Sequence, residues 1–216
     1  MRSLLTLVFG VLTTLSLTQC QLTIPSKELG YVYGTGQPDA LVKIAAYIDF
    51  TCPYSKAAYT TLLQVANDFP SSEVQFKVHA FSVPYHRHSH TISKAANVLN
   101  DFKSPKSATV FDWITAAYDN IASLTTTATK DQSDTEIVNF LASLAQNVSG
   151  ISTADFISGV YDTNVDSLTR LGWKYGVTRG VYGVPSITVN DVFTDADSSW
   201  TVSQWKNLID GLLSKQ

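Results

Sequence analysis

The sequence contains little cysteine and little charge. Of its 216 residues two are cysteine (Cys20 and Cys52), one is methionine and 15% are charged. So few cysteines exclude a disulfide-stapled scaffold. The formal net charge is −3, and acidic and basic residues are interspersed. We therefore expect neither a nucleic-acid partner nor a polybasic membrane-binding patch.

Long hydrophobic runs are also absent, apart from one short run at the amino terminus. Arg2 precedes the apolar residues 4–12, which are too few to span a bilayer and are followed by the more polar residues 18–21. This pattern predicts a signal peptide over residues 1–20, with cleavage near Cys20. A bacterial lipoprotein anchor at Cys20 is the competing interpretation.

The predicted cleavage leaves residues 21–216, enough for one domain with a sizeable core. We expect this mature chain to be secreted or to lie in an endomembrane lumen (the periplasm in a bacterium), without a membrane anchor. Asn147 begins a glycosylation triplet that matters only in a eukaryotic host.

The mature chain retains one cysteine, Cys52, which stands where the apolar run 44–50 gives way to a helix-like pattern. Pro53 suits the first position of a helix, because that position needs no backbone donor. A sulfur at such a junction faces the first N–H groups of the helix, which favour the thiolate. The position therefore predicts a nucleophilic cysteine. An inert buried cysteine is the alternative.

A second motif lies near the carboxyl terminus, where residues 180–190 read Gly-Val-Tyr-Gly-Val-Pro-Ser-Ile-Thr-Val-Asn. Together with the Cys-Pro-x-x motif at Cys52, this segment resembles the thioredoxin superfamily, in particular its DsbA-like branch. The resemblance implies an α/β, thioredoxin-like fold with a helical insertion. It also implies that Pro185 is cis and lies against Cys52, and that Val184 offers its backbone to a bound peptide or to glutathione.

The hydrophobic pattern agrees with such a fold. Strand, helix, strand over residues 41–50, 56–67 and 74–81 predicts a right-handed parallel crossover. Four helices are expected next, within an insertion at about residues 86–165. Residues 168–175 then lead to residues 180–185, called the proline loop below. The expected helices cover residues 92–99, 107–124, 133–147 and 153–161, and they are followed by a hairpin of residues 186–190 and 192–194 and a closing helix at 202–213.

The motif departs from the dithiol pattern of the family at Ser55, which stands where a second cysteine is expected. A hydroxyl cannot resolve a mixed disulfide, because only a thiolate is competent for exchange. Ser55 either donates a hydrogen bond to the Cys52 thiolate or is an ordinary residue of the first helical turn. Tyr54, inside the motif, is expected to be exposed and to contact substrate together with Pro53, although simple aromatic packing explains it equally well.

Three of the four histidines, His86, His88 and His90, follow the second predicted strand. Strand ends gather at one edge of a parallel sheet, so we expect this segment near Cys52. His86 is the favoured candidate for stabilising the thiolate. Solvated histidines and a zinc or copper site are the alternatives, although the segment lacks a carboxylate or thiol to complete a ligand set, and no metal is predicted. Asp49 is a candidate proton acceptor, with a structural role favoured.

Three functions fit these features. The leading hypothesis is a secreted monothiol thiol-disulfide oxidoreductase or isomerase, with Cys52, Ser55 and Pro185 at its centre. It would act on thiol- or disulfide-containing proteins or peptides, with glutathione as a possible co-substrate and no bound cofactor. The second is a non-catalytic peptide-binding or chaperone-like module. The third rests on a similarity between residues 49–55 and the Ser-Pro-Tyr-Ser segment of kappa-type glutathione transferases, where Cys52 replaces the catalytic serine.

Overall fold

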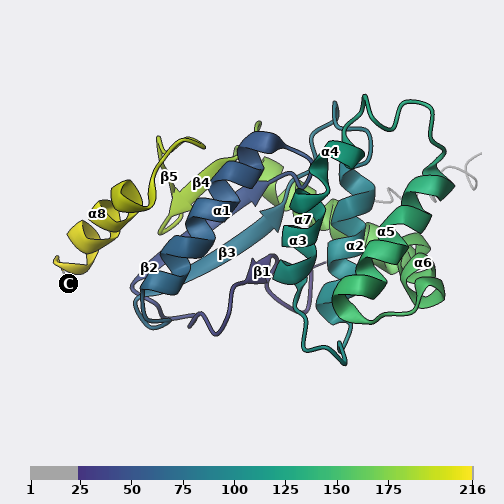
Figure 1. Ribbon diagram of the computed structural model, residues 1–216. Coiled ribbons are helices and arrows are strands. Elements are labelled where there is room, and N and C mark those ends of the chain that lie inside the picture. Colours follow the sequence, from purple (N-terminus) through teal and green to yellow (C-terminus); the bar gives the residue numbers. More distant parts are fainter. Residues whose placement is uncertain (1–23, 216) are drawn as a thin grey trace, which may run out of the picture.

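The computed structural model describes residues 24–215 and contains a mixed five-stranded sheet of order β1-β3-β2-β4-β5 (Figure 1). The predicted signal peptide and Cys20 lie outside the described residues. The strands are β1 (Tyr31–Val32), β2 (Val42–Ile48), β3 (Val74–Ala80), β4 (Ser186–Val189) and β5 (Val192–Phe193). Of these, β1 was not predicted, since two residues are too few to form a recognisable pattern.

The centre of the sheet follows the predicted crossover. Strand β2 pairs in parallel with β3, with Tyr47 opposite His79, and helix α1 connects them. On its other side β2 pairs antiparallel with β4. The β4–β5 hairpin turns at Asn190 and Asp191, which both have positive φ (48° and 64°). Positive φ at both central residues is the geometry of a type I′ turn, which suits Asn and Asp.

Eight helices are present in the described part of the chain, and most begin close to the predicted positions. Their bounds are α1 (Pro53–Asp68), α2 (Ser89–Asp101), α3 (Val110–Asp119), α4 (Ile121–Leu124), α5 (Asp134–Ser149), α6 (Thr153–Tyr161), α7 (Thr163–Thr178) and α8 (Val202–Leu213).

Two helical predictions need correction. The single helix expected over residues 107–124 begins later, at Val110, since Ser107 has a positive φ (58°). It is also divided into α3 and α4, because Asn120 leaves helical geometry between them. A capping box of Thr109 and Asp112 starts α3. Residues 168–175 are the middle of the longer helix α7, which begins where Asp162 caps it through its side chain.

Different helices pack on the two faces of the sheet. Ile44, Ala46 and Ile48 of β2 point into the main core beneath α1 and α8, and the helices α2, α3, α5 and α6 extend this core to one side (Figure 1). Tyr47 points to the opposite face, where α7 packs. Helix α7 approaches so closely that a Cβ on Gly176 would lie 2.7 Å from the Phe81 ring.

Side chains on the α7 face of the sheet are more buried than the alternating pattern of β3 predicts. Six of the seven residues of β3 are buried. Gln75 donates to the backbone of Gln37 and Lys77 pairs with Glu28, so the chain before β2 covers their side of the sheet. No helix among residues 24–215 is long and apolar enough to cross a membrane.

Candidate functional site

Cys52 is the N-cap residue of α1, at the point where the chain leaves β2 (Figure 1). Its N–H donates to the carbonyl of Asp49 (3.1 Å), and its carbonyl accepts from the N–H of Lys56 (2.9 Å). Pro53 occupies the first helical position, as predicted. Cys52 is a free cysteine and only 5% exposed. The turn therefore places the sulfur at the helix N-terminus, with little of it open to solvent.

Pro185 lies at the same edge of the sheet. It directly precedes β4, whose first residue Ser186 pairs with Tyr47 near the end of β2. The Val184–Pro185 peptide bond is cis. Val184 is half-buried and packs against the cluster that contains Tyr47. The two sequence motifs are thus brought to the ends of two paired strands.

Ser55 is fully buried, and its hydroxyl oxygen accepts a hydrogen bond from the backbone N–H of Asp49 (3.3 Å). The hydroxyl of Tyr118, which donates to the carbonyl of Asp49 (3.1 Å), lies beside it. Burial raises the pKa of Tyr118 well above its usual value, and the nearby Asp49 and Cys52 raise it further. In this arrangement Ser55 helps to hold the backbone turn before the sulfur.

The carboxylate of Asp49 is the centre of this edge. It is fully buried, and Oδ1 accepts from the N–H and the hydroxyl of Thr51 (2.8 and 2.6 Å). Oδ2 accepts from the N–H of Val83 (2.9 Å) and the hydroxyl of Ser89 (2.7 Å). One side chain therefore ties the Cys52 turn to the loop after β3 and to the start of α2, which is the structural role favoured from the sequence.

The histidine segment emerges beside this edge, as its position after a parallel strand predicts. His86 Nδ1 lies 3.2 Å from Asp49 Oδ2, although the contact lacks hydrogen-bond geometry. His86 thus approaches the site through Asp49.

The other two histidines point elsewhere. His88 is buried with no partner for Nε2 among the described residues, and burial lowers its pKa. His90 Nε2 lies 3.0 Å from Asp166 Oδ1. Among residues 24–215 no three His, Cys, Asp or Glu side chains form a group that could hold a metal ion.

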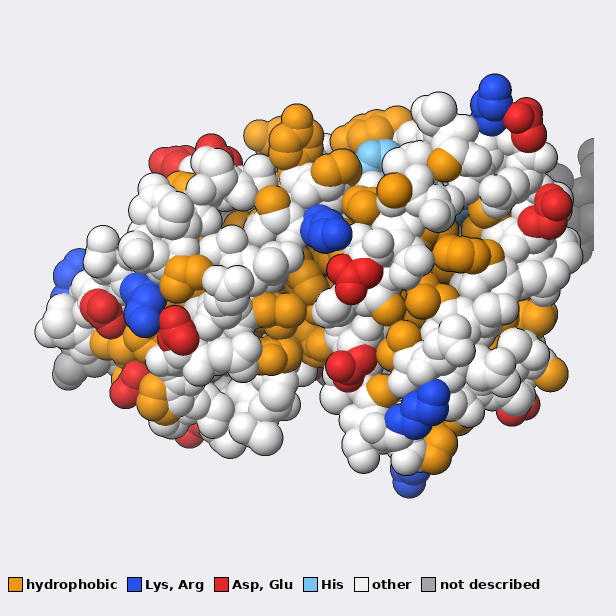
Figure 2. Space-filling view, viewed as in Figure 1, with side chains coloured by type: hydrophobic (Ala, Val, Ile, Leu, Met, Phe, Trp, Pro, Cys, Tyr) orange, Lys and Arg blue, Asp and Glu red, His pale blue; other side chains and the backbone are white. Residues whose placement is uncertain are grey.

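Three tyrosines project from segments near the site. Tyr54 in the motif is 68% exposed, Tyr85 in the histidine segment 67% and Tyr182 in the proline loop 99%. Figure 2 shows hydrophobic side chains gathered along the upper rim of the molecule, above the end of α1 where that helix begins. Exposed aromatic side chains around a candidate site are typical of a surface that binds peptide.

Several residues of the site were not identified from the sequence. Tyr118 comes from α3, more than sixty residues after the motif, and contributes a buried hydroxyl. Lys56 donates to the Tyr118 carbonyl (2.9 Å), which joins α1 to the end of α3. Ser89 is an ordinary serine in the sequence. Only the three-dimensional arrangement reveals these contacts.

A family model described as Thioredoxin matches residues 30–211, which is most of the chain. No curated protein sequence matches it. Many solved structures do, and those described next share less than a fifth of their residues with this chain.

Three of these similar structures illustrate the likeness. The first is a putative protein-disulfide isomerase from Pseudomonas syringae (TM-score 0.70, 17% identity, 82% of this chain and 96% of that chain). The second is a single-residue variant of α-DsbA1 from Wolbachia pipientis (TM-score 0.67, 15% identity, 90% and 95% covered). The third is MdbA from Actinomyces oris, a thiol-disulfide oxidoreductase (TM-score 0.63, 19% identity, 84% and 85% covered). At these identities the likeness establishes the fold.

Proposed function

This chain belongs to the thioredoxin superfamily and has the fold of its DsbA-like branch, and on that premise we propose that it is a monothiol thiol-disulfide oxidoreductase. One observation carries the proposal. The free cysteine Cys52 occupies the N-cap position of α1, at the sheet edge where β4 begins after Pro185. Backbone N–H groups at a helix start favour an anionic sulfur.

The proposed reaction uses one protein sulfur. The Cys52 thiolate attacks a substrate disulfide, so that a bond forms between Cys52 and one substrate sulfur while the other leaves as a thiolate. An external thiolate such as glutathione then attacks the substrate sulfur of this mixed disulfide. The step releases the Cys52 thiolate and leaves substrate and glutathione joined. Each exchange breaks one disulfide and forms one, so it needs no further oxidant or reductant.

Ser55 explains why an external thiol is required. Its hydroxyl cannot attack a mixed disulfide, and it is buried and engaged with the backbone of Asp49. The proposed substrates are disulfide-containing proteins or peptides, which would lie along the exposed Tyr54 and Tyr182 and pair with the backbone of Val184.

The test compares the wild type with Cys52→Ala, Ser55→Ala and Ser55→Cys. A disulfide-bonded peptide is added without glutathione, and adducts are measured by mass spectrometry. We expect a persistent adduct in the wild type and in Ser55→Ala, none in Cys52→Ala, and a short-lived one in Ser55→Cys, which regains a resolving thiol. Exchange that persists in Cys52→Ala would overturn the proposal.

A second function is favoured by the burial of the sulfur. Cys52 is 5% exposed while the tyrosines around it are open, an arrangement that also suits a peptide-binding module without redox chemistry. Binding of an unfolded polypeptide that is equal in the wild type and Cys52→Ala, together with no adduct in the wild type, would support this function instead.

We further propose that the protein is exported. Export into an oxidising compartment fits a protein that acts on disulfides. Amino-terminal sequencing of the protein purified from its native host should find a chain that begins near Gln21, and a chain that retains Met1 would contradict export.

A further inference from the structure

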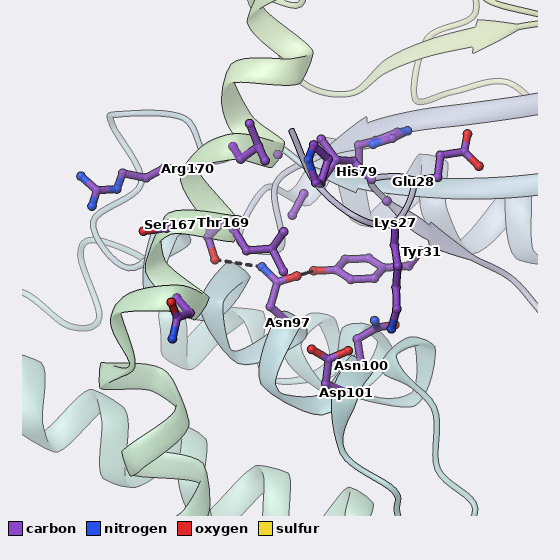
Figure 3. A pocket seen from close by; sticks show the side chains of 18 of the residues that line it. Lys27, Glu28, Tyr31, His79, Asn97, Asn100, Asp101, Ser167, Thr169 and Arg170 are labelled. Carbon is purple, nitrogen blue, oxygen red and sulfur yellow. Dashed lines mark hydrogen bonds between the residues drawn. The ribbon is translucent and has the colours of Figure 1, made fainter. Parts of the chain in front are cut away.

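A cleft of about 660 Å³ lies on the α7 face of the sheet, away from the Cys52 edge (Figure 3). It is bordered by the segment 25–31, by α2 and by α7, and neither Cys52 nor Pro185 lines it. Its volume is within the range of small-molecule sites in proteins. The proposed thiol chemistry makes no use of it.

A chain of hydrogen bonds fixes the walls of the cleft. Tyr31 donates to Asn97 Oδ1 (2.8 Å), Asn97 Nδ2 donates to Thr169 Oγ1 (2.9 Å), and Thr169 donates to the carbonyl of Val165 (2.8 Å). Figure 3 shows Tyr31, Asn97 and Thr169 in a row across the cleft. Because these residues come from β1, α2 and α7, the cleft is formed before any ligand arrives.

His79 contributes a buried polar group to the lining. It is 4% exposed and stacks between Tyr47 and Tyr175, with ring centroids 4.7 and 5.1 Å away. Its ring makes no hydrogen bond with any residue of the described range 24–215. A neutral imidazole has one donor and one acceptor nitrogen. His79 therefore leaves hydrogen-bonding capacity for a molecule in the cleft.

The charges around the cleft divide into paired and free groups. Glu28 pairs with Lys77 (2.6 Å), and Arg170 pairs with Asp166 (2.7 Å). Within the described residues, the ammonium groups of Lys27 and Lys174 have no carboxylate partner within hydrogen-bonding or ion-pairing distance. Lys27 belongs to the segment 25–31 and Lys174 to α7, and both line the cleft. Asp101 of α2 also lines it and has no cationic partner among the described residues. Two unpaired cations against one unpaired carboxylate leave a net positive charge, which favours an anion beside the lysines.

An apolar hollow of about 470 Å³ adjoins the cleft at the same two lysines. Leu29, Leu171 and Tyr175 are among its lining residues. Two free cations thus stand where a polar cleft meets an apolar hollow. A molecule that matches this arrangement carries a negative group and a hydrocarbon part.

We propose that this combined site binds a small amphipathic carboxylate, with its carboxylate between Lys27 and Lys174 and its hydrocarbon chain against Leu171. The carboxylate gains two charge-assisted contacts, and the chain is removed from water. The site is independent of Cys52, so it is unaffected by failure of the proposed exchange chemistry.

Calorimetric titration of the full chain with decanoate, below its micelle-forming concentration, tests the proposal. We expect saturable binding of one molecule, about tenfold weaker for Lys174→Met and for Lys27→Met, which corresponds to the loss of one favourable contact. Lys206→Met on the distant helix α8 is the matched control and should bind as the wild type does. Decanol should bind at least about tenfold more weakly than decanoate, because it lacks the charge.

Nuclear magnetic resonance locates the bound molecule. Decanoate should shift the ring signals of His79 and leave those of the buried His88 unchanged. Tyr182→Ser serves as a second control, since it removes an aromatic side chain from the Cys52 edge. No saturable binding, equal binding of decanol, equal binding by the Lys174→Met and Lys206→Met variants, or loss of binding in Tyr182→Ser would each overturn the proposal.

Discussion

Asp49 and His79 are buried ionisable residues near the ends of the neighbouring strands β2 and β3, yet their surroundings are opposite. Four donors from Thr51, Val83 and Ser89 reach the Asp49 carboxylate, whereas the His79 ring has aromatic neighbours on its two faces. Burial, assisted by the charge of Lys77, lowers the pKa of His79 to about 3.

The difference shows two ways of burying an ionisable group. A carboxylate has only acceptors, so the fold must supply donors to it, and here those donors tie three segments together around the Cys52 turn. An imidazole can lose its charge and be buried at a smaller cost. The edge with the supplied donors carries the proposed chemistry. The neutral His79 ring, on the α7 face of the sheet, borders an open cleft.

Replacement of Asp49 should have the largest effect. Asp49→Ala leaves four donors at the site without their acceptor, and each buried unpaired group costs about 1–3 kcal/mol. Water that enters the space left by the carboxylate reduces part of this cost. We expect the free energy of unfolding to fall by about 4 kcal/mol, as measured by urea denaturation. Asp155→Ala is the control, since Asp155 accepts from the hydroxyl of the exposed Ser152, and it should cost less than about 1 kcal/mol. A similar loss in both variants would contradict the central role of Asp49.

Lowering the pH should reduce the stability of the protein through His79. The unfolded chain takes up a proton near pH 6.5, whereas folded His79 does so only near pH 3, so stability that is present above pH 6.5 is lost as the pH falls towards 3. The loss from this group amounts to about 2 kcal/mol at pH 5. His88, whose pKa is also lowered by burial, contributes in the same direction.

The variant His79→Phe keeps the aromatic stack and removes the titration. Urea denaturation at pH 7 and pH 5 should show that the variant loses about 2 kcal/mol less than the wild type over this interval. Carboxylates titrate equally in both proteins and cancel in the comparison. Parallel pH profiles would show that His79 is solvated in the folded state.

Much of the Cys52 edge could be predicted because its signals are local. Cys52 followed by Pro53 at a strand-to-helix junction, and Pro185 before a strand, each depend on a few adjacent residues. The turn at Asn190 and Asp191 was predicted for the same reason. The parallel crossover then placed the histidine segment at the correct edge.

The contacts that complete the site are not local. Asp49 receives donors from residues 34 and 40 positions away, and Tyr118 lies 69 positions from Asp49. The sequence favoured His86, but nothing in it shows that His88 is buried or that His90 meets Asp166. The burial of His79 depends on the distant helix α7 and on Gly30.

Gly30 offers a smaller and more local test of the His79 environment. Its φ is +94°, and a Cβ there would lie 2.6 Å from Cε1 of the His79 ring. Gly34 also has a positive φ (+60°), but a Cβ there would meet no atom within 4 Å. Both alanine variants suffer backbone strain, and Gly30→Ala must also displace the ring.

We therefore expect Gly30→Ala to lower the free energy of unfolding by about 1 kcal/mol more than Gly34→Ala does. Thermal denaturation should show this as a lower midpoint for Gly30→Ala. The variant should also raise the pKa of His79, because the displaced ring gains contact with water, and nuclear magnetic resonance titration would detect this. Equal effects of the two substitutions would show that the ring is not tightly held.

The ion pair of Glu28 and Lys77 should give the smallest effect. Hydrogen bonding to Lys77 lowers the pKa of Glu28, so its contribution is present above pH 4.5 and is lost as the pH falls through the lowered value. Because the Glu28 side chain is 75% exposed, solvent screens the pair. Glu28→Gln should cost less than about 0.5 kcal/mol at pH 7, and less still in high salt.

Glu28→Gln should also change the pKa of His79. The negative charge of Glu28 raises the pKa of His79, against the larger lowering by burial. Removing that charge should lower the pKa of His79 further and extend the acid-induced loss of stability to slightly lower pH. Nuclear magnetic resonance titration of the His79 ring measures the change. A large fall in this pKa would contradict the conclusion that burial, rather than nearby charge, keeps the ring neutral.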